Sequence, residues 1–192
     1  MEQAEDGDIS LLFLDASHFV MGCDFLGCIY GKTRRFVRTF SGRKRFHVLG
    51  AMDYRSKKVL TAANDSYITA SEVCDLLRGI AAEYGEKKVY LVLDNARYQK
   101  CKMVQQLAEQ LHIQLLYIPP YSPNLNLIER LWKFVKGELR SKYFNDFHLF
   151  QHKILSIINS TDGINKSKID NLIGQGVQLF HHLSTLSLNT LA

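Results

Sequence analysis

Near-continuous apolar runs that end at a polar turn are the first regular feature of the chain. Residues 9–14 (ISLLFL) precede Asp15, residues 89–93 (VYLVL) precede Asp94, and residues 113–118 lead into a proline-rich turn. A strand that is covered on both faces reads as such a run, because neither set of alternating side chains meets water. These three segments are therefore predicted to be central strands of a covered sheet.

Shorter β-rich segments lie between the first and second runs. Residues 27–30, 35–40 and 45–52 favour strands, residues 41–44 favour a hairpin turn, and residues 59–63 predict one more strand. Consecutive strands joined by tight turns pair antiparallel. We therefore expect an antiparallel first part of the sheet.

Helical periodicity begins near residue 69. Either Thr69 or Ser71 can cap a helix that runs to Tyr84, where Gly85 ends it. Further helices are predicted from residue 95 to 111, after a cap at Ser122 or Asn124, over 147–158 and from residue 168. Strands that alternate with helices indicate parallel crossovers, so the chain is predicted to be an α/β domain.

Composition fits one globular domain whose excess of positive charge is local. The 192 residues are 46% apolar with a net charge of +5, and no apolar run is long enough for a membrane span. No acidic residue lies between Asp24 and Asp53, and this basic window holds Lys32, Arg34, Arg35, Arg38, Arg43, Lys44 and Arg45. Such a window favours a polyanionic partner, although a hairpin that carries charge against aggregation would have the same composition.

The cysteines favour reduced thiols. The four cysteines have no CxxC spacing, and no signal peptide precedes them, which is typical of a cytoplasmic protein. A zinc site can be drawn from His18, Cys23, Cys28 and His47, but their spacing matches no common ligand pattern.

Three carboxylates are candidates for shared chemistry. Asp15 and Asp94 would meet at the edge formed by the carboxyl ends of two parallel strands, and Glu129 on the next helix could reach that edge. Three acids there would repel one another. The positive charge of Mg²⁺ or Mn²⁺, ions that prefer hard oxygen ligands such as carboxylates, would relieve that repulsion. Two such ions could activate a nucleophile against a phosphodiester.

Simpler interpretations of the same residues remain open. Either aspartate could cap a helix, and Glu129 could form an exposed i, i+4 pair with Lys133. Asp53 also follows an apolar run, but its strand is predicted to be antiparallel, so its end points the other way and we rank it below the other three.

Three segments around these carboxylates resemble the catalytic domain of mariner-superfamily transposases of the bacterial insertion-sequence branch. They are residues 13–19 (FLDASHF), 91–97 (LVLDNAR) and 119–132 (PPYSPNLNLIERLW), and 34 residues separate Asp94 from Glu129. The resemblance extends from about residue 11 to about residue 140. It implies a ribonuclease-H-like α/β fold, in which a five-stranded mixed sheet, three antiparallel strands followed by parallel crossovers, is flanked by helices.

The resemblance also implies a reaction and a set of site residues. Water activated by two Mg²⁺ ions, for which Mn²⁺ can substitute, would hydrolyse the transposon ends, and the freed 3′-hydroxyl would attack target DNA. Asp15, Asp94 and Glu129 would be the catalytic and metal-binding residues. Second-shell or DNA contacts are expected from His18, Asn95, Arg97, Tyr121, Ser122, Asn126 and Lys133. The basic window, together with Lys136 and Arg140, would contact the DNA backbone.

The sequence also departs from the family pattern. Ala16, Gln99 and Leu127 replace a common glutamate, histidine and proline, yet each of the three carboxylates is present. Relatives carry helix-turn-helix regions that bind transposon ends, and only 14 residues precede Asp15, so such a region is expected to be separate or missing. We expect a flexible N-terminus (1–8), a catalytic domain (9–160) and a C-terminal helical extension of that domain (161–192).

We expect the protein to act in a bacterial cytoplasm, at the nucleoid, with a homodimer in the active complex.

Two other functions are compatible with the same residues. One is a different nuclease on this fold, such as a ribonuclease or a junction resolvase. The other is a non-enzymatic DNA-binding or regulatory transposase remnant, against which the three intact carboxylates argue.

Overall fold

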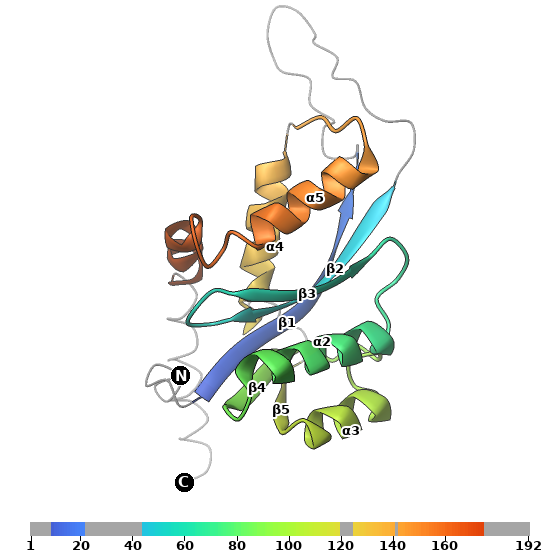
Figure 1. Ribbon diagram of the computed structural model, residues 1–192, viewed down its shortest axis with the longest axis vertical. Helices are drawn as coiled ribbons and strands as arrows, with labels where there is room; N and C mark the ends of the chain where they lie inside the picture. Colours follow the sequence, from blue (N-terminus) through green and yellow to red (C-terminus); the bar gives the residue numbers. More distant parts are fainter. Residues whose placement is uncertain (1–8, 22–43, 120–124, 141, 175–192) are drawn as a thin grey trace, which may run out of the picture.

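A five-stranded mixed sheet forms the centre of the protein. The computed structural model describes residues 9–21, 44–119, 125–140 and 142–174. The strands are β1 (Ile9–Val20), β2 (Arg45–Asp53), β3 (Val59–Asn64), β4 (Lys88–Leu93) and β5 (Ile113–Tyr117), in the order β3-β2-β1-β4-β5 (Figure 1). β1, β2 and β3 pair antiparallel, whereas β4 and β5 run parallel to β1. The predicted fold class is confirmed.

Helices cover both faces of this sheet. They are α2 (Ala70–Tyr84), α3 (Lys102–Gln110), α4 (Ile128–Leu139) and α5 (Phe147–Ile158), and residues 166–174 are also helical. α2 and α3 pack on the face that carries Leu12 and Leu14, while α4 and α5 pack on the face that carries Phe13 and Phe19. β1 is thus covered on both sides, which explains why its sequence lacks polar alternation.

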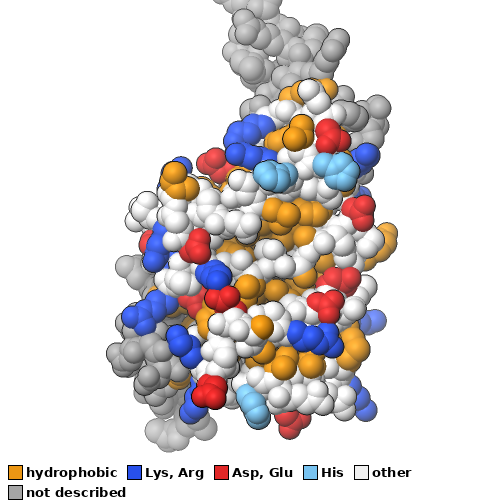
Figure 2. Space-filling model, in the orientation of Figure 1, with side chains coloured by type: hydrophobic (Ala, Val, Ile, Leu, Met, Phe, Trp, Pro, Cys, Tyr) orange, Lys and Arg blue, Asp and Glu red, His pale blue; other side chains and the backbone are white. Residues whose placement is uncertain are grey.

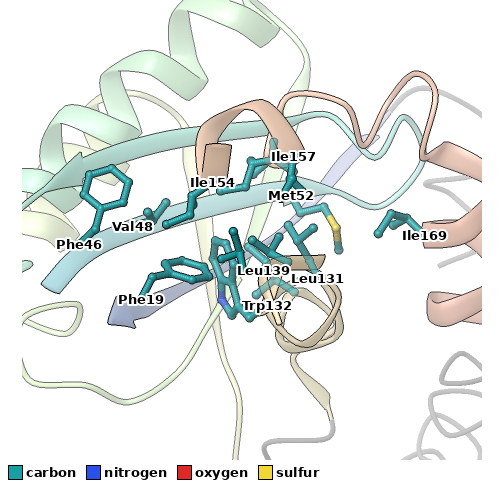
Figure 3. Close-up of a cluster of buried hydrophobic side chains, with 14 of the residues drawn as sticks. Phe19, Phe46, Val48, Met52, Leu131, Trp132, Leu139, Ile154, Ile157 and Ile169 are labelled. Carbon is teal, nitrogen blue, oxygen red and sulfur yellow. The ribbon is translucent and has the colours of Figure 1, made fainter. Parts of the chain in front are cut away.

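The core between the sheet and α4 joins segments that are far apart in the sequence. Figure 3 shows strand residues such as Phe19 and Met52 facing Trp132 and Leu131 of α4 and Ile154 of α5. Ile169 and Ile173, from the helical segment after α5, are buried in the same cluster. The described part of the segment 161–192 therefore packs against the same core as the sheet, and α4 is held against β1 and β2 over its whole length.

Several element boundaries differ from those predicted. β1 does not end before Asp15 but continues to Val20, because it stays paired with β2 after its pairing with β4 has ended at Phe13. The helix predicted from residue 95 begins only at Lys102, since residues 95–101 form turns. α4 begins at Ile128, whereas the caps predicted at Ser122 and Asn124 lie outside the described residues.

Other predictions fall wholly or mostly outside the described part of the chain. These are the strands at 27–30 and 35–40, most of the hairpin turn at 41–44, and the flexible N-terminus at 1–8. Within the described ranges, the helices are all too short or too polar to cross a bilayer.

The start of α2 decides between its two predicted caps. Thr69 is the N-cap: its hydroxyl accepts the N–H of Ser71, and the Glu72 carboxylate accepts the N–H of Thr69 at 2.7 Å. This reciprocal arrangement is a capping box, which satisfies donors that have no partner within the helix.

Replacing Thr69 by alanine should therefore lower the free energy of unfolding by about 1 kcal/mol, because the cap is lost. Ser71→Ala is the matched control, since Ser71 contributes only its backbone N–H and should change the unfolding free energy little. Urea denaturation followed by circular dichroism measures both. Equal losses in the two variants would contradict the assignment of the cap.

Candidate active site

Asp15 and Asp94 lie at the place where β1 and β4 part. The parallel register pairs Phe13 with Val92, and continuing it by two residues places Asp15 opposite Asp94. Asp94 directly follows β4, whereas Asp15 lies within β1 and is paired with Gly50 of β2. Both side chains are partly buried. The two aspartates thus lie side by side at the carboxyl ends of neighbouring parallel strands, the arrangement expected if the two strands are neighbours.

The helix cap proposed as an alternative role for each aspartate does not occur. Asp15 lies inside a strand, and the N-cap of α3 is Cys101. The Asp94 carboxylate instead accepts the N–H of Ala96 at 2.9 Å, so it closes a turn directly after β4. This turn fixes the orientation of one carboxylate oxygen and leaves the other available to a ligand.

Glu129 is brought to the same edge by the first turn of α4. The side-chain amide of Asn126 donates to the carbonyl of Leu14 at 2.9 Å, and the carbonyl of Asn126 accepts the N–H of Glu129 at 3.1 Å. One buried residue therefore joins the backbone just before Asp15 to the backbone of Glu129. Among the ion pairs of the described residues, none joins Glu129 to Lys133, so the simpler interpretation of Glu129 is not realised.

The pKa of Asp15 responds to its burial and to both of the other carboxylates. The pKa of Asp15 is raised from 3.8 to about 6, mainly by burial and in smaller part by the negative charges of Asp94 and Glu129. Hydrogen bonds from the Ala16 N–H and the Trp132 side chain act in the opposite direction. Asp15 therefore carries a charge that is partly desolvated and repelled by two neighbours.

This donor set is chemically suited to a hard divalent cation. Three carboxylates offer oxygen ligands only, and a cation would offset the repulsion that raises the pKa of Asp15. In the arrangement described here, no group of three or more His, Cys, Asp or Glu side chains within the described ranges is close enough to hold a metal ion. Sharing an ion would therefore require the carboxylate side chains to move closer together than they are in this structure.

The other residues predicted around the site are placed differently from one another. His18 points to the opposite face of β1 from Asp15, because three positions separate them along the strand, and it packs against His47 instead. Asn95 donates to the carbonyl of Ile118 and so joins the ends of β4 and β5. Arg97 and Lys133 are exposed. Tyr121 and Ser122 lie outside the described residues.

The predicted DNA-contacting cations are only partly described. Lys44, Arg45, Lys136 and Arg140 are exposed, and Lys136 lies over the ring of Phe19 at 5.7 Å. Lys32, Arg34, Arg35, Arg38 and Arg43 lie outside the described residues. On the face drawn in Figure 2, Lys and Arg side chains alternate with Asp and Glu and do not form one continuous patch.

Two aromatic residues of the site escaped the sequence analysis. Trp132, given no role there beyond ending the segment 119–132, donates its indole N–H to Asp15 at 3.1 Å. Tyr98 lies close enough to Asp94 and Asp15 for their charges to raise its pKa, after the larger effect of burial. The signal for Trp132 was its position three residues after Glu129, on the same side of the helix.

A mixed sheet in the order β3-β2-β1-β4-β5, with helices on both faces and acidic residues at the carboxyl ends of its parallel strands, has the architecture of the ribonuclease-H-like fold. The sequence pattern of one family within this class, described as DDE superfamily endonuclease, matches residues 10–151. The chain therefore belongs to the DDE superfamily endonucleases, and the resemblance to transposase catalytic domains is confirmed.

Known proteins extend this comparison. The chain is 30% identical over 105 residues to the insertion element IS630 uncharacterized 39 kDa protein of Shigella sonnei, a match that covers 54% of this chain and 30% of that protein. The fold of this chain is similar to that of the transposase in the mariner Mos1 paired end complex with Mg. The TM-score is 0.64 and the identity is 16%, over 88% of this chain and 53% of the Mos1 chain. For the Mos1 paired end complex with Mn, the TM-score is 0.59 and the identity 15%, over 87% and 54% of the two chains.

The chain thus spans about a third of the curated relative and about half of the Mos1 chains. At this level of identity the structural similarity establishes the fold, and the family is established by the sequence pattern.

The raised pKa of Asp15 predicts a pH-dependent stability in the absence of metal. Because the folded-state pKa of about 6 exceeds the ordinary value of 3.8, the folded protein binds this proton more tightly than the unfolded chain. The stability contributed by this group is therefore complete at about pH 4 and is lost as the pH rises through about 6.

Asp15→Asn removes this loss and keeps an oxygen that can accept from Trp132. With a chelator present, we expect the variant to melt at a higher temperature than the wild type at about pH 8, and at a similar temperature at about pH 4. Asp162→Asn, which removes an exposed carboxylate, serves as the control in the same calorimetric scans. A difference between Asp15→Asn and wild type that does not change with pH would contradict the assignment.

Proposed function

We propose that this chain is the catalytic part of a transposase, which cleaves the DNA backbone at transposon ends and joins the freed 3′-hydroxyl to target DNA. The observation that carries the proposal is the gathering of Asp15, Asp94 and Glu129 at one edge of the sheet, expressed in the raised pKa of Asp15. Membership of the DDE superfamily endonucleases supports phosphodiester chemistry at that edge.

Each of the three carboxylates would act as a ligand and would be oriented by its own neighbours. Asp15, Asp94 and Glu129 are the residues that would hold Mg²⁺ or Mn²⁺. A pair of such cations, when bound, supplies an activated water or hydroxyl nucleophile and stabilises the leaving oxygen of the phosphodiester. The Ala96 N–H orients Asp94, the Trp132 indole orients Asp15, and Asn126 fixes Glu129 relative to β1.

Exposed cations on α4 would place the DNA beside this site. Lys133, Lys136 and Arg140 follow Glu129 along the helix and are exposed, so they can neutralise phosphates without reading the base sequence. Their charge would also offset the repulsion between the DNA and the three carboxylates.

Recognition of the transposon ends would come from a helix-turn-helix region outside this sequence. The chain spans only part of its relatives, and the similar Mos1 structures are described as paired end complexes, which supports an active assembly of two copies on DNA. We place this activity at the nucleoid of a bacterial cytoplasm.

Loss of one carboxylate should abolish cleavage without unfolding the protein. We expect Asp94→Asn to reduce metal-dependent nicking of supercoiled plasmid at least about 100-fold, because the variant keeps the turn at Ala96 but loses a charged ligand. Asp53→Asn is the control: this aspartate is the last residue of β2, and it accepts from Tyr84 and from the Arg55 and Ser56 backbone N–H groups.

Nicking is followed on gels with Mg²⁺, with Mn²⁺ and with chelator, and melting curves verify folding. Equal nicking by Asp94→Asn and wild type would remove this carboxylate from the site. A marked preference for branched DNA or an RNA–DNA hybrid over plasmid duplex would favour a resolvase or a ribonuclease.

The exposed cations on α4 and at its C-cap lead to a separate prediction about DNA binding. Log affinity falls linearly with log salt concentration. If Lys136 and Arg140 each neutralise one phosphate, this negative slope should become shallower by about 2 in the double alanine variant. Lys87 and Lys88 are the matched control pair, because they lie at the start of β4, at the opposite end of that strand from Asp94. Fluorescence anisotropy with duplex DNA over a range of salt concentrations gives both slopes. Equal slopes for the two double variants would mean that α4 does not face the DNA.

A further inference from the structure

The indole of Trp132 makes the one side-chain hydrogen bond recorded for Asp15 among the described residues. The indole N–H donates to the Asp15 Oδ2 atom at 3.1 Å, across 117 positions of sequence. Trp132 is only 3% exposed, and a buried indole N–H normally requires an acceptor. The contact therefore serves both groups: it satisfies the indole and it restricts rotation of the carboxylate.

The backbone opposite Asp15 is shaped to admit this ring. Gly50 is the β2 partner of Asp15, and a Cβ atom built on Gly50 would lie 2.7 Å from Cη2 and 3.0 Å from Cζ2 of Trp132. Any larger residue would push the ring away, so the absence of a side chain at Gly50 allows the indole to lie against β2. The small residue and the large ring together set the distance from α4 to Asp15.

The remaining contacts of the ring hold it in this position. Phe19, further along β1, meets Trp132 edge-on with ring centroids 6.2 Å apart and an interplanar angle of 78°. Figure 3 shows the indole between Phe19 and the residues of α4, within the cluster that joins the helix to the sheet. Glu129 is one helical turn before Trp132, so one rigid element carries both the third carboxylate and the group that orients the first.

We propose that Trp132 is the positioning residue for Asp15, and that Gly50 is the site that lets it act. This inference rests on the proposed function, because it concerns the readiness of Asp15 to bind a divalent cation. A carboxylate fixed by a neighbouring donor loses less rotational freedom when it binds metal, and loss of such a donor typically weakens metal affinity about 10- to 100-fold. The packing of α4 against the sheet therefore both places Glu129 and orients Asp15 through Trp132.

Metal affinity, measured without catalysis, tests the proposal. Trp132→Phe keeps an aromatic ring and removes the N–H, so the Mg²⁺ concentration that gives half of the maximal thermal stabilisation should rise about tenfold. Gly50→Ala keeps the indole but displaces it, and a rise in the same direction is expected. Phe19→Leu is the matched control, because it changes the packing of the same ring without touching the hydrogen bond, and its midpoint should stay within about twofold of wild type.

A second measurement uses the wild-type fold and does not depend on variants of Trp132. Trp132 is the single tryptophan of the chain, so its fluorescence reports on this one position. Titration with Mg²⁺ should change its emission with the same midpoint as the thermal stabilisation, and Asp15→Asn should abolish the change.

The outcomes separate the inference from the function on which it rests. Equal Mg²⁺ midpoints for Trp132→Phe and wild type, or a thermal shift of the wild type with unchanged emission, would overturn the positioning role and leave the metal-dependent function intact. A wild-type protein that shows no metal-dependent thermal shift at all would overturn both.

Discussion

A partly desolvated negative charge in the middle of the central strand is the constraint on which this structure depends. β1 is covered by α2 and α3 on one face and by α4 and α5 on the other, and Asp15 is placed on it where the pairing with β4 ends. Burial and two like charges make the ionised form of Asp15 unfavourable. Among the residues that the structure describes, no Lys, Arg or His forms an ion pair with Asp15 to remove this cost. The fold supplies hydrogen bonds from neutral donors, which leave the carboxylate available to a ligand.

α4 connects this local constraint to the stability of the whole domain. Its apolar residues belong to the core cluster that includes strand residues, α5 and the helical segment 166–174. The energy that places Glu129 and Trp132 therefore comes from burial spread over many side chains, and the site itself contributes little favourable energy. Such an arrangement can hold a repulsive cluster of carboxylates in place, because the burial of apolar side chains along α4 offsets the repulsion.

Much of the fold could be predicted from the sequence, because its signals are local. The apolar runs identified β1, β4 and β5, and helical periodicity identified α2 and α5, since burial on both faces or on one stripe leaves a pattern in consecutive residues. The change from antiparallel to parallel pairing followed from the change between tight turns and crossovers. Asp15 and Asp94 were placed at one edge by the same reasoning.

The features that could not be predicted from the sequence depend on tertiary contacts between elements that are far apart along the chain. The extension of β1 past Asp15 depends on pairing with β2, and residues 95–101 form turns and bends where the sequence had predicted the start of a helix. The bond from Trp132 to Asp15 and the need for a glycine at position 50 both arise from elements that meet only in the folded protein. An aromatic residue on an apolar stripe gives the same sequence signal whether its polar atom is idle or bound to a catalytic carboxylate.

The distribution of unsatisfied polar atoms leads to the same part of the molecule. Among buried side chains of the described residues, Gln99 Oε1 and Asn126 Oδ1 are the two oxygen atoms without a hydrogen-bond partner. Asn126 precedes Glu129 and bonds to the residue before Asp15, while Gln99 follows Tyr98, whose hydroxyl group feels the charges of both aspartates. Buried polar atoms without partners are costly, and folds tolerate them chiefly where function requires polar groups in fixed positions. The packing in the two clusters that hold β1 from either side offsets that cost, so the polar atoms left without partners lie near the carboxylates and not in the apolar core.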